Sequence, residues 1–199
     1  PFTKCIIGHS VRSYSDIIKV APNTKFITIL RNPIDRCISH YQQRVLKHGY
    51  IPFEEFLGRG WVRNLQTRYI AGAESAMLAK EILNKHFFCV GILEEFDEFM
   101  LLLKHKLNAF EFDSSYVRMR VAKDKTQKLG ILDKYRALIE DVHQEDIALY
   151  NYAKNVVLPA SIKLYGPSFQ ADLQKFKTLN EQSNPSASRN YIDYIFRRF

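Results

Sequence analysis

The stretch that decides the fold is residues 25–41, which read Lys25-Phe26-Ile27-Thr28-Ile29-Leu30-Arg31-Asn32-Pro33-Ile34-Asp35-Arg36-Cys37-Ile38-Ser39-His40-Tyr41. Its first six residues are mostly β-branched or aromatic and predict a buried strand. Asn32 then stands at the N-cap position of a helix, and Pro33 stands at the first helical position. Asp35 follows in the first turn, where a negative charge suits the helix dipole. The stretch therefore predicts a strand that passes directly into a helix.

The same alternation continues along the chain and indicates the fold class. Apolar residues at helical spacing from Ile34 to Val45 predict that the first helix extends to about Gly49. Further strands are predicted at 4–7, ending at Gly8, and at 87–90, ending at Gly91; further helices are predicted at 64–70, 73–86, 96–107 and 141–157. Residues 111–130 lose periodicity and gain charge. Strands that alternate with helices predict an α/β protein with a three-layer parallel sheet, covered by helices on both faces.

Composition limits the classes of protein that need to be considered. The 199 residues carry 29 Lys and Arg against 21 Asp and Glu, a net charge of +8, and 46% of them are hydrophobic. This excludes a largely disordered chain and predicts one domain over residues 1–180, followed by a tail over 181–199. No apolar run is long enough to span a membrane. The three cysteines lie far apart, so we expect small buried side chains rather than disulfides or a zinc site.

Arg31 is the first candidate for a binding residue, because it ends a strand and precedes a helix N-terminus. A guanidinium beside free helix amides and the positive end of the dipole is a suitable phosphate site. Ser39, two turns into the helix, offers a hydroxyl to the same anion. The alternative is that Arg31 pairs with an acidic side chain and that Ser39 is a small packing residue. The positive net charge agrees with an anionic partner without identifying it.

The order of residues in this helix resembles a known motif. Arg-x-Pro-x-x-Arg-x-x-Ser-x-Tyr over residues 31–41 resembles the 3′-phosphate-binding motif of sulfotransferases that use 3′-phosphoadenosine-5′-phosphosulfate (PAPS). Residues 64–72, 90–99 and 146–153 resemble, in the same order, blocks of the branch that contains heparan sulfate 2-O- and uronyl 2-O-sulfotransferases. The resemblance spans roughly residues 5–158 and implies a sulfotransferase fold related to P-loop nucleotide-binding proteins.

The resemblance also assigns roles to individual residues. It implies that Arg31 and Ser39 hold the 3′-phosphate of PAPS and that His9, after the strand-end Gly8, is the general base. A histidine near its ordinary pKa of about 6.5 suits that task. Arg118 and Arg120 belong to a basic run that, in the family, faces the nucleotide and the sugar chain; a solvated charged loop is the alternative. The implied substrates are PAPS and a carbohydrate hydroxyl, without a metal and without nucleic acid as partner.

One expected element is missing from this sequence. The family holds the 5′-phosphosulfate with a glycine- and lysine-containing strand–loop–helix before the Gly-His element, and neither that loop nor a G-x-x-x-x-G-K-[ST] match occurs here. We expect the loop to precede Pro1 in a longer protein; an inactive remnant is the alternative. A non-catalytic polyanion-binding module and a relative of P-loop kinases are further readings. The compartment would be the cytoplasm for a bacterial enzyme and the Golgi lumen for an animal one.

Overall fold

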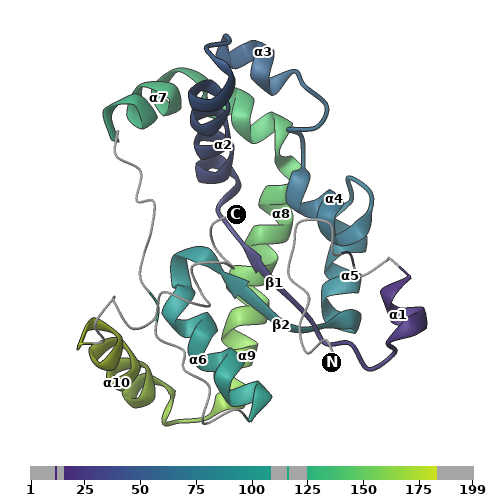
Figure 1. The fold of residues 1–199 in the computed structure, drawn as a ribbon, viewed down its shortest axis with the longest axis vertical. Helices are drawn as coiled ribbons and strands as arrows, with labels where there is room; N and C mark the ends of the chain where they lie inside the picture. Colours follow the sequence, from purple (N-terminus) through teal and green to yellow (C-terminus); the bar gives the residue numbers. More distant parts are fainter. Residues whose placement is uncertain (1–11, 13–15, 109–115, 117–124, 183–199) are drawn as a thin grey trace.

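The computed structural model describes residue 12, residues 16–108, residue 116 and residues 125–182. Its centre is a parallel pair of strands, β1 (Phe26–Leu30) and β2 (Phe87–Ile92), surrounded by helices (Figure 1). Leu30 pairs with Ile92, so both strands end at the same edge of the pair. The described part of the chain is therefore α/β and mostly helical, with a two-stranded parallel sheet. None of its helices is long and apolar enough to cross a membrane.

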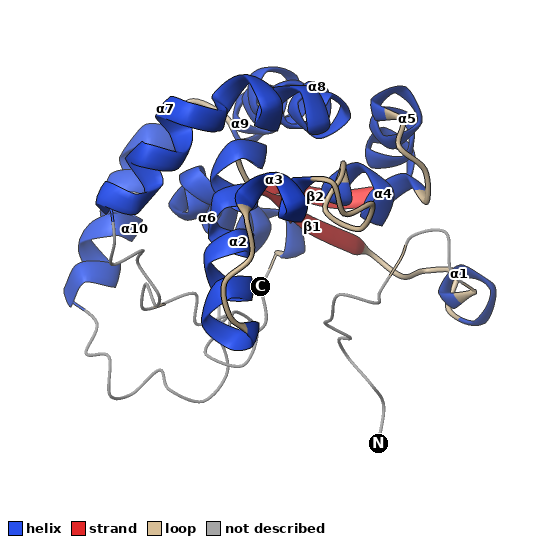
Figure 2. Cartoon of the chain, turned by 90° about the horizontal axis from the view of Figure 1, so that it is seen from above, coloured by secondary structure: helices blue, strands red, loops and turns tan. Residues whose placement is uncertain are grey.

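Helices occur at every position where the sequence predicts one, and further helices occur where none is predicted. Between β1 and β2 lie α2 (Pro33–His48), α3 (Phe53–Leu57), α4 (Leu65–Ala71) and α5 (Ala76–His86); α1 (Ile17–Val20) precedes β1. After β2 come a 3₁₀ turn (Leu93–Glu95), α6 (Phe96–Leu107), α7 (Lys125–Val142), α8 (Gln144–Tyr152), a π-helical segment (Ala153–Val157), α9 (Leu158–Tyr165) and α10 (Phe169–Gln182). Figure 2 shows α4 and α5 close to one end of the strand pair, with α1 set apart.

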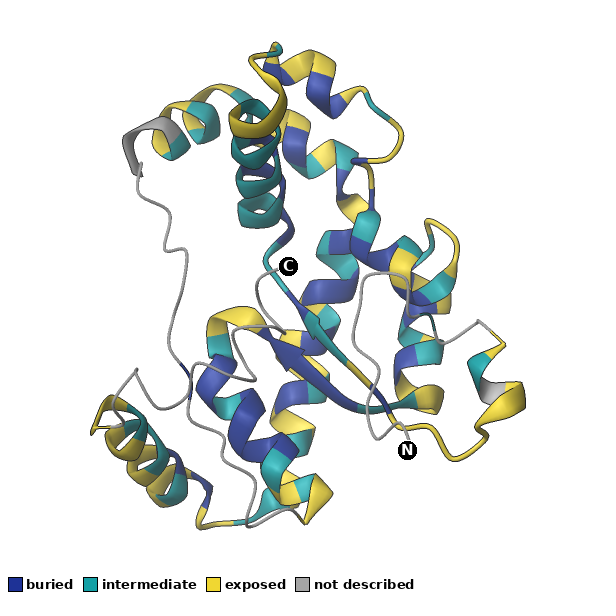
Figure 3. Ribbon diagram, in the orientation of Figure 1, coloured by how far each residue is buried: buried dark blue, intermediate teal, exposed yellow. Residues whose placement is uncertain are grey.

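Two apolar clusters enclose the strands, and a third lies beside them. Cys89 and Ile29 pack with the apolar face of α6, whereas Leu30, Val90 and Ile92 pack with residues of α5, α8 and α9. The third cluster joins α2, α3 and α7 through the side chains of Ile38, Phe56 and Ile139, among others. Figure 3 shows the resulting concentration of buried residues along β2 and α6. Burial of this apolar surface is the main force that holds the elements together.

The β2 strand corrects one prediction. It does not end at Gly91 but continues to Ile92, and Gly91 pairs with Ile29 of β1. The glycine is there for packing, because a Cβ atom at this position would overlap the ring of Phe99 on α6. The glycine therefore marks a close approach of helix and strand rather than a stop.

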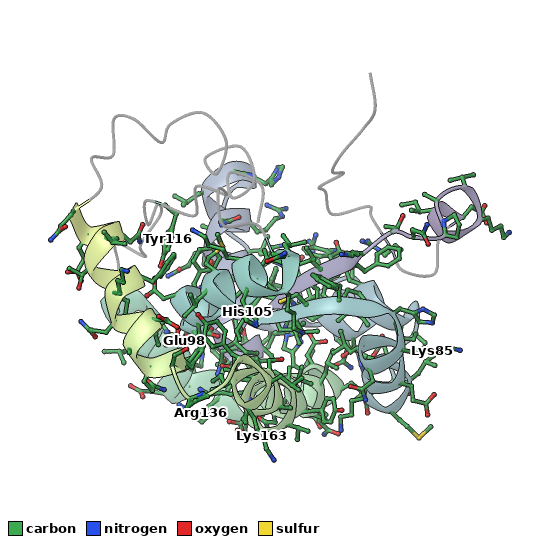
Figure 4. The ribbon with its side chains drawn as sticks, turned by 90° about the horizontal axis from the view of Figure 1, so that it is seen from below. Lys85, Glu98, His105, Tyr116, Arg136 and Lys163 are labelled. Atoms are coloured by element: carbon green, nitrogen blue, oxygen red, sulfur yellow. The ribbon has the colours of Figure 1, made fainter. Side chains whose placement is uncertain are left out.

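The second half of the chain departs further from the predictions. Residues 125–130, expected to be non-periodic, form the start of α7, and the helix predicted for 141–157 is divided at His143. The sequence pattern does not predict helices α9 and α10. Figure 4 shows Tyr116 between α10 and α6; its backbone N–H donates to Asn180 and its hydroxyl donates to Asp97. The predicted strand at 4–7 and most of the predicted tail lie outside the described residues.

The cysteines in the described residues agree with expectation. Cys37 on α2 and Cys89 on β2 are buried and form no disulfide. Burial raises the pKa of the Cys37 thiol to about 12 and that of Cys89 to about 11. Both thiols therefore stay protonated and behave as small hydrophobic side chains. Cys5 lies outside the described residues.

Candidate functional site

The candidate site lies at the edge of the sheet where both strands end. Arg31 and Asn32 follow β1, and Glu94 lies just after β2. A hydrogen bond of 2.9 Å from the Asn32 N–H to Glu94 Oε1 joins the two strand ends. In α/β proteins, ligands bind beyond the carboxyl ends of parallel strands. The geometry therefore places Arg31 where the prediction expects a ligand.

The backbone of Arg31 is held from the side by the buried Gln66 of α4. Gln66 Oε1 accepts from the Arg31 N–H at 2.8 Å, and Gln66 Nε2 donates to the Arg31 carbonyl at 2.9 Å. The Arg31 side chain is half-buried, and its guanidinium makes no hydrogen bond or ion pair with any described residue. The alternative reading, in which Arg31 pairs with an acidic side chain, finds no support in the described part of the chain.

Asn32 changes the expected picture of the helix N-terminus. Its side-chain oxygen accepts from the backbone N–H of Ile34 at 3.0 Å and of Asp35 at 3.2 Å, and its carbonyl accepts from Arg36. Pro33 has no N–H. The first amides of α2 are thus already paired, contrary to the prediction that free amides would hold the phosphate. Any anion bound here would therefore depend on the Arg31 guanidinium and on the helix dipole.

Ser39 lies on the side of α2 away from its apolar face. At 100° per residue, Ser39 is about 150° from the centre of that face, and it lies one turn beyond Asp35. Its side chain is half-buried, and no described residue bonds to its hydroxyl. About 9 Å of helix axis separates it from Pro33, given a rise of about 1.5 Å per residue. Arg31 and Ser39 can therefore share one anion only if the Arg31 side chain extends along the helix toward Ser39.

The three other predicted site residues, His9, Arg118 and Arg120, lie outside the described residues. Lys128, the last residue of the basic run, belongs to the start of α7, and its Nζ pairs with Asp35 Oδ1 of α2 at 2.7 Å. This ion pair brings the end of the basic run against the first turn of the helix that follows Arg31.

Two buried side chains that sequence reasoning did not identify support this edge. Asp146 of α8 is fully buried and accepts hydrogen bonds from the Thr67 N–H at 2.7 Å, the Thr67 hydroxyl at 2.8 Å and the Gln66 N–H at 3.2 Å. Gln66, in turn, pairs with Arg31. Both residues lie in blocks that carry the family resemblance, but only the three-dimensional arrangement reveals their roles.

Three basic side chains lie close together beside the site. They are the half-buried Arg36 and His40 of α2 and the fully buried His143 between α7 and α8. Burial first, and then the nearby Arg36 charge, lowers the pKa of both histidines to about 4. His143 is fully buried, and neither of its ring nitrogens has a hydrogen-bond partner among the described residues. The two imidazoles are therefore neutral near pH 7; His143 lies inside the protein, whereas His40 is only half-buried.

A pocket of about 740 Å³ opens at the start of α2 and is lined by Asn32 and Pro33, together with residues of α7 and α8. Glu140 and Asp141 are part of its lining, so it is a poor place for a phosphate. Within the described residues, no group of three or more His, Cys, Asp or Glu side chains is arranged to hold a metal ion. No family model matches the chain, and no curated protein or solved structure shows significant similarity to it.

Proposed function

We propose that this protein transfers a sulfuryl group from PAPS to a carbohydrate hydroxyl. Arg31 and Ser39 hold the 3′-phosphate, Arg118 and Arg120 contribute positive charge beside the nucleotide, and His9 is the general base. The proposal includes the finer fold, a three-layer parallel sheet of the sulfotransferase type, of which β1 and β2 are two strands. The acceptor is a glycan, and PAPS leaves as adenosine 3′,5′-bisphosphate.

One observation supports this proposal more than any other. The Arg31 guanidinium stands at the carboxyl edge of two parallel strands, without a partner among the described residues, while both polar groups of its backbone are paired with Gln66. A fixed backbone whose planar guanidinium is bound by none of the described residues is suited to bidentate binding of a phosphate. The residue pattern of 31–41, which resembles the 3′-phosphate motif, lies at this same place.

The reaction would need few chemical groups. The acceptor oxygen attacks the sulfur in line, a new S–O bond forms, and the S–O bond to the 5′-phosphate breaks with its electron pair on the departing nucleotide. His9 takes the proton of the acceptor hydroxyl. Most of the acceleration would come from positioning the two substrates and from positive charge around the transferring group. Arg31 and Ser39 would contribute by anchoring the far end of the nucleotide.

Calorimetric titration with two nucleotides tests the proposal. Adenosine 3′,5′-bisphosphate and adenosine 5′-monophosphate differ only in the 3′-phosphate, so the ratio of their Kd values isolates that group. We expect Arg31→Ala to weaken binding of the bisphosphate by about 10- to 100-fold, the loss of a charge-assisted hydrogen-bonded pair of about 1.5–3 kcal/mol. Binding of the monophosphate should change little.

The matched control is Arg136→Ala, which removes the same charge from α7, where Arg136 pairs with Glu140 (Arg136 is labelled in Figure 4). It should leave both Kd values as they are. Equal bisphosphate binding by the wild type and Arg31→Ala would refute the assignment of Arg31. Binding to sulfated glycan with a steep salt dependence, but with no affinity for the bisphosphate, would instead identify a non-catalytic polyanion binder.

A further inference from the structure

The amide of Gln66 pairs with Arg31 as a neighbouring strand would. It offers one acceptor to the Arg31 N–H and one donor to the Arg31 carbonyl, at 2.8 and 2.9 Å. The next residue, Asn32, directs its N–H to Glu94, which follows β2. The Gln66 side chain therefore binds the backbone of Arg31, and the Glu94 side chain binds the N–H of Asn32. Together they extend the pairing of β1 beyond its last residue, Leu30.

Gln66 is itself fixed by a buried carboxylate. Asn64, at the N-cap position of α4, has a left-handed backbone and makes no side-chain cap. Asp146, from α8, provides the cap instead: its carboxylate accepts from the N–H groups of Gln66 and Thr67 and from the Thr67 hydroxyl. A negative charge at a helix N-terminus that accepts several N–H bonds is a strong interaction. Asp146 thus locks the first turn of α4, from which Gln66 reaches Arg31.

A guanidinium at the end of a strand needs such support. Arginine loses much rotamer entropy when it binds, and a backbone that could move would add to that cost. Small displacements of a positioning group weaken bidentate contacts strongly. Gln66 is buried, with 9% of its surface exposed, so its amide is not free to exchange Arg31 for water.

We propose that Gln66 is the positioning residue for Arg31, and that the buried Asp146 holds Gln66 in place through the first turn of α4. This inference rests on the proposed function, because it concerns how firmly Arg31 holds the 3′-phosphate. Gln66 touches neither nucleotide nor acceptor in this scheme. Its effect passes through the backbone of Arg31.

The test uses Gln66→Met, which has nearly the same shape but can make neither hydrogen bond. The probes are adenosine 3′,5′-bisphosphate and adenosine 5′-monophosphate, as above. We expect the bisphosphate Kd to rise about 5- to 20-fold, with little change for the monophosphate. In an Arg31→Ala background, Gln66→Met should have no further effect on the ratio of the two Kd values, because the two residues act in series.

Tyr116→Phe is the control for a purely structural effect. It removes the buried hydroxyl donor to Asp97 and so lowers stability, but it leaves the bonds between Gln66 and Arg31 and those of Asp146 with α4. It should lower the melting temperature without changing the ratio of the two Kd values. If Gln66→Met does not fold, Gln66→Glu replaces it; this variant loses the donor to the Arg31 carbonyl and should also reduce the preference for the bisphosphate.

The outcomes separate the two proposals. A wild-type protein that binds both nucleotides equally, or neither of them, contradicts the proposed function. A wild type that prefers the bisphosphate through Arg31, together with a Gln66 variant of unchanged preference, overturns only the role of Gln66. That role is also overturned if Gln66→Met lowers the preference as much without Arg31 as with it.

Discussion

The buried imidazole of His143 predicts a specific dependence of stability on pH. His143 is fully buried, neither ring nitrogen has a partner among the described residues, and its pKa is lowered to about 4 from an ordinary 6.5. Burial is the main cause, and the charges of Arg36 and Arg63, with His40, add to it. Between pH 6.5 and pH 4 the unfolded chain therefore binds a proton at this position that the folded protein does not.

The size of the effect follows from the two pKa values. Stability rises with pH wherever the unfolded state binds more protons, so this contribution is complete near neutral pH and is lost as the pH falls. For a pKa of 6.5 unfolded and about 4 folded, the loss between pH 7.5 and pH 5 is about 2 kcal/mol, and it approaches about 3 kcal/mol at pH 4.

Urea unfolding of the wild type and His143→Leu at several pH values measures this contribution. Leucine is close in volume and requires no hydrogen bond, so we expect little loss of stability at pH 7.5, within about 1 kcal/mol. The free energy of unfolding of the variant minus that of the wild type should rise by about 2 kcal/mol when the pH falls from 7.5 to 5. Groups that do not interact with His143 titrate alike in both proteins and cancel in the difference.

The matched control is His48→Leu, which removes an exposed imidazole from the last turn of α2. It measures the effect of losing a histidine that is not buried. A difference between His143→Leu and the wild type that stays constant from pH 7.5 to pH 5 would refute the reasoning. It would mean that His143 is as readily protonated in the folded protein as in the unfolded chain.

Three further predictions concern packing and hydrogen bonds, each measured as the free energy of unfolding in urea. Gly91→Ala should destabilise the protein by about 1–3 kcal/mol, because the new methyl group overlaps the Phe99 ring; an unchanged value would show that α6 moves away without cost. Asn32→Ala should cost about 1 kcal/mol through loss of the bonds to the Ile34 and Asp35 amides, whereas a gain in stability would contradict the capping role. Tyr116→Phe should cost about 1–2 kcal/mol, since its buried hydroxyl bonds to Asp97 at 2.6 Å; Tyr135→Phe, whose bond to Glu54 is exposed, is the comparison and should cost less.

Local sequence signals predict β1 and α2 well because these elements are encoded by neighbouring residues. The β-branched run, the Asn32 cap and the apolar face from Ile34 to Val45 act within one or two turns, and the observed bounds agree closely with them. The start of α7 escapes prediction because its first turn lies in a charged segment, where the helix is held by packing of Ile139 against α2 and α3 rather than by a strong apolar pattern. Helix α10 is not predicted for a similar reason: only two of its residues, Phe169 and Leu173, are buried, so its apolar pattern is weak.

Some residues of the candidate site can likewise be predicted from local sequence, and others cannot. Arg31 and Ser39 can be found from sequence because they belong to one short pattern along the chain. Gln66 and Asp146 cannot be found as supporting residues, because the contact between them joins positions 80 residues apart, and no periodicity encodes such a contact. The expectation of free amides at the start of α2 is wrong for a local reason: the same Asn32 that makes a good cap uses those amides itself.

The two arginines of the 31–41 pattern, Arg31 and Arg36, have different environments. This difference indicates which of them could bind an anion at the strand edge. Arg36 is half-buried; desolvation lowers its pKa despite the opposing charge of Asp146, and its guanidinium donates to the Val62 carbonyl. It cannot turn toward a ligand at the strand edge without leaving that environment. Many other cations are neutralised by ion pairs, such as Lys128 with Asp35 and Arg63 with Glu74. Net charge therefore says little about the site, and an anion at this edge would depend on Arg31, whose backbone is fixed and whose guanidinium is unpaired among the described residues.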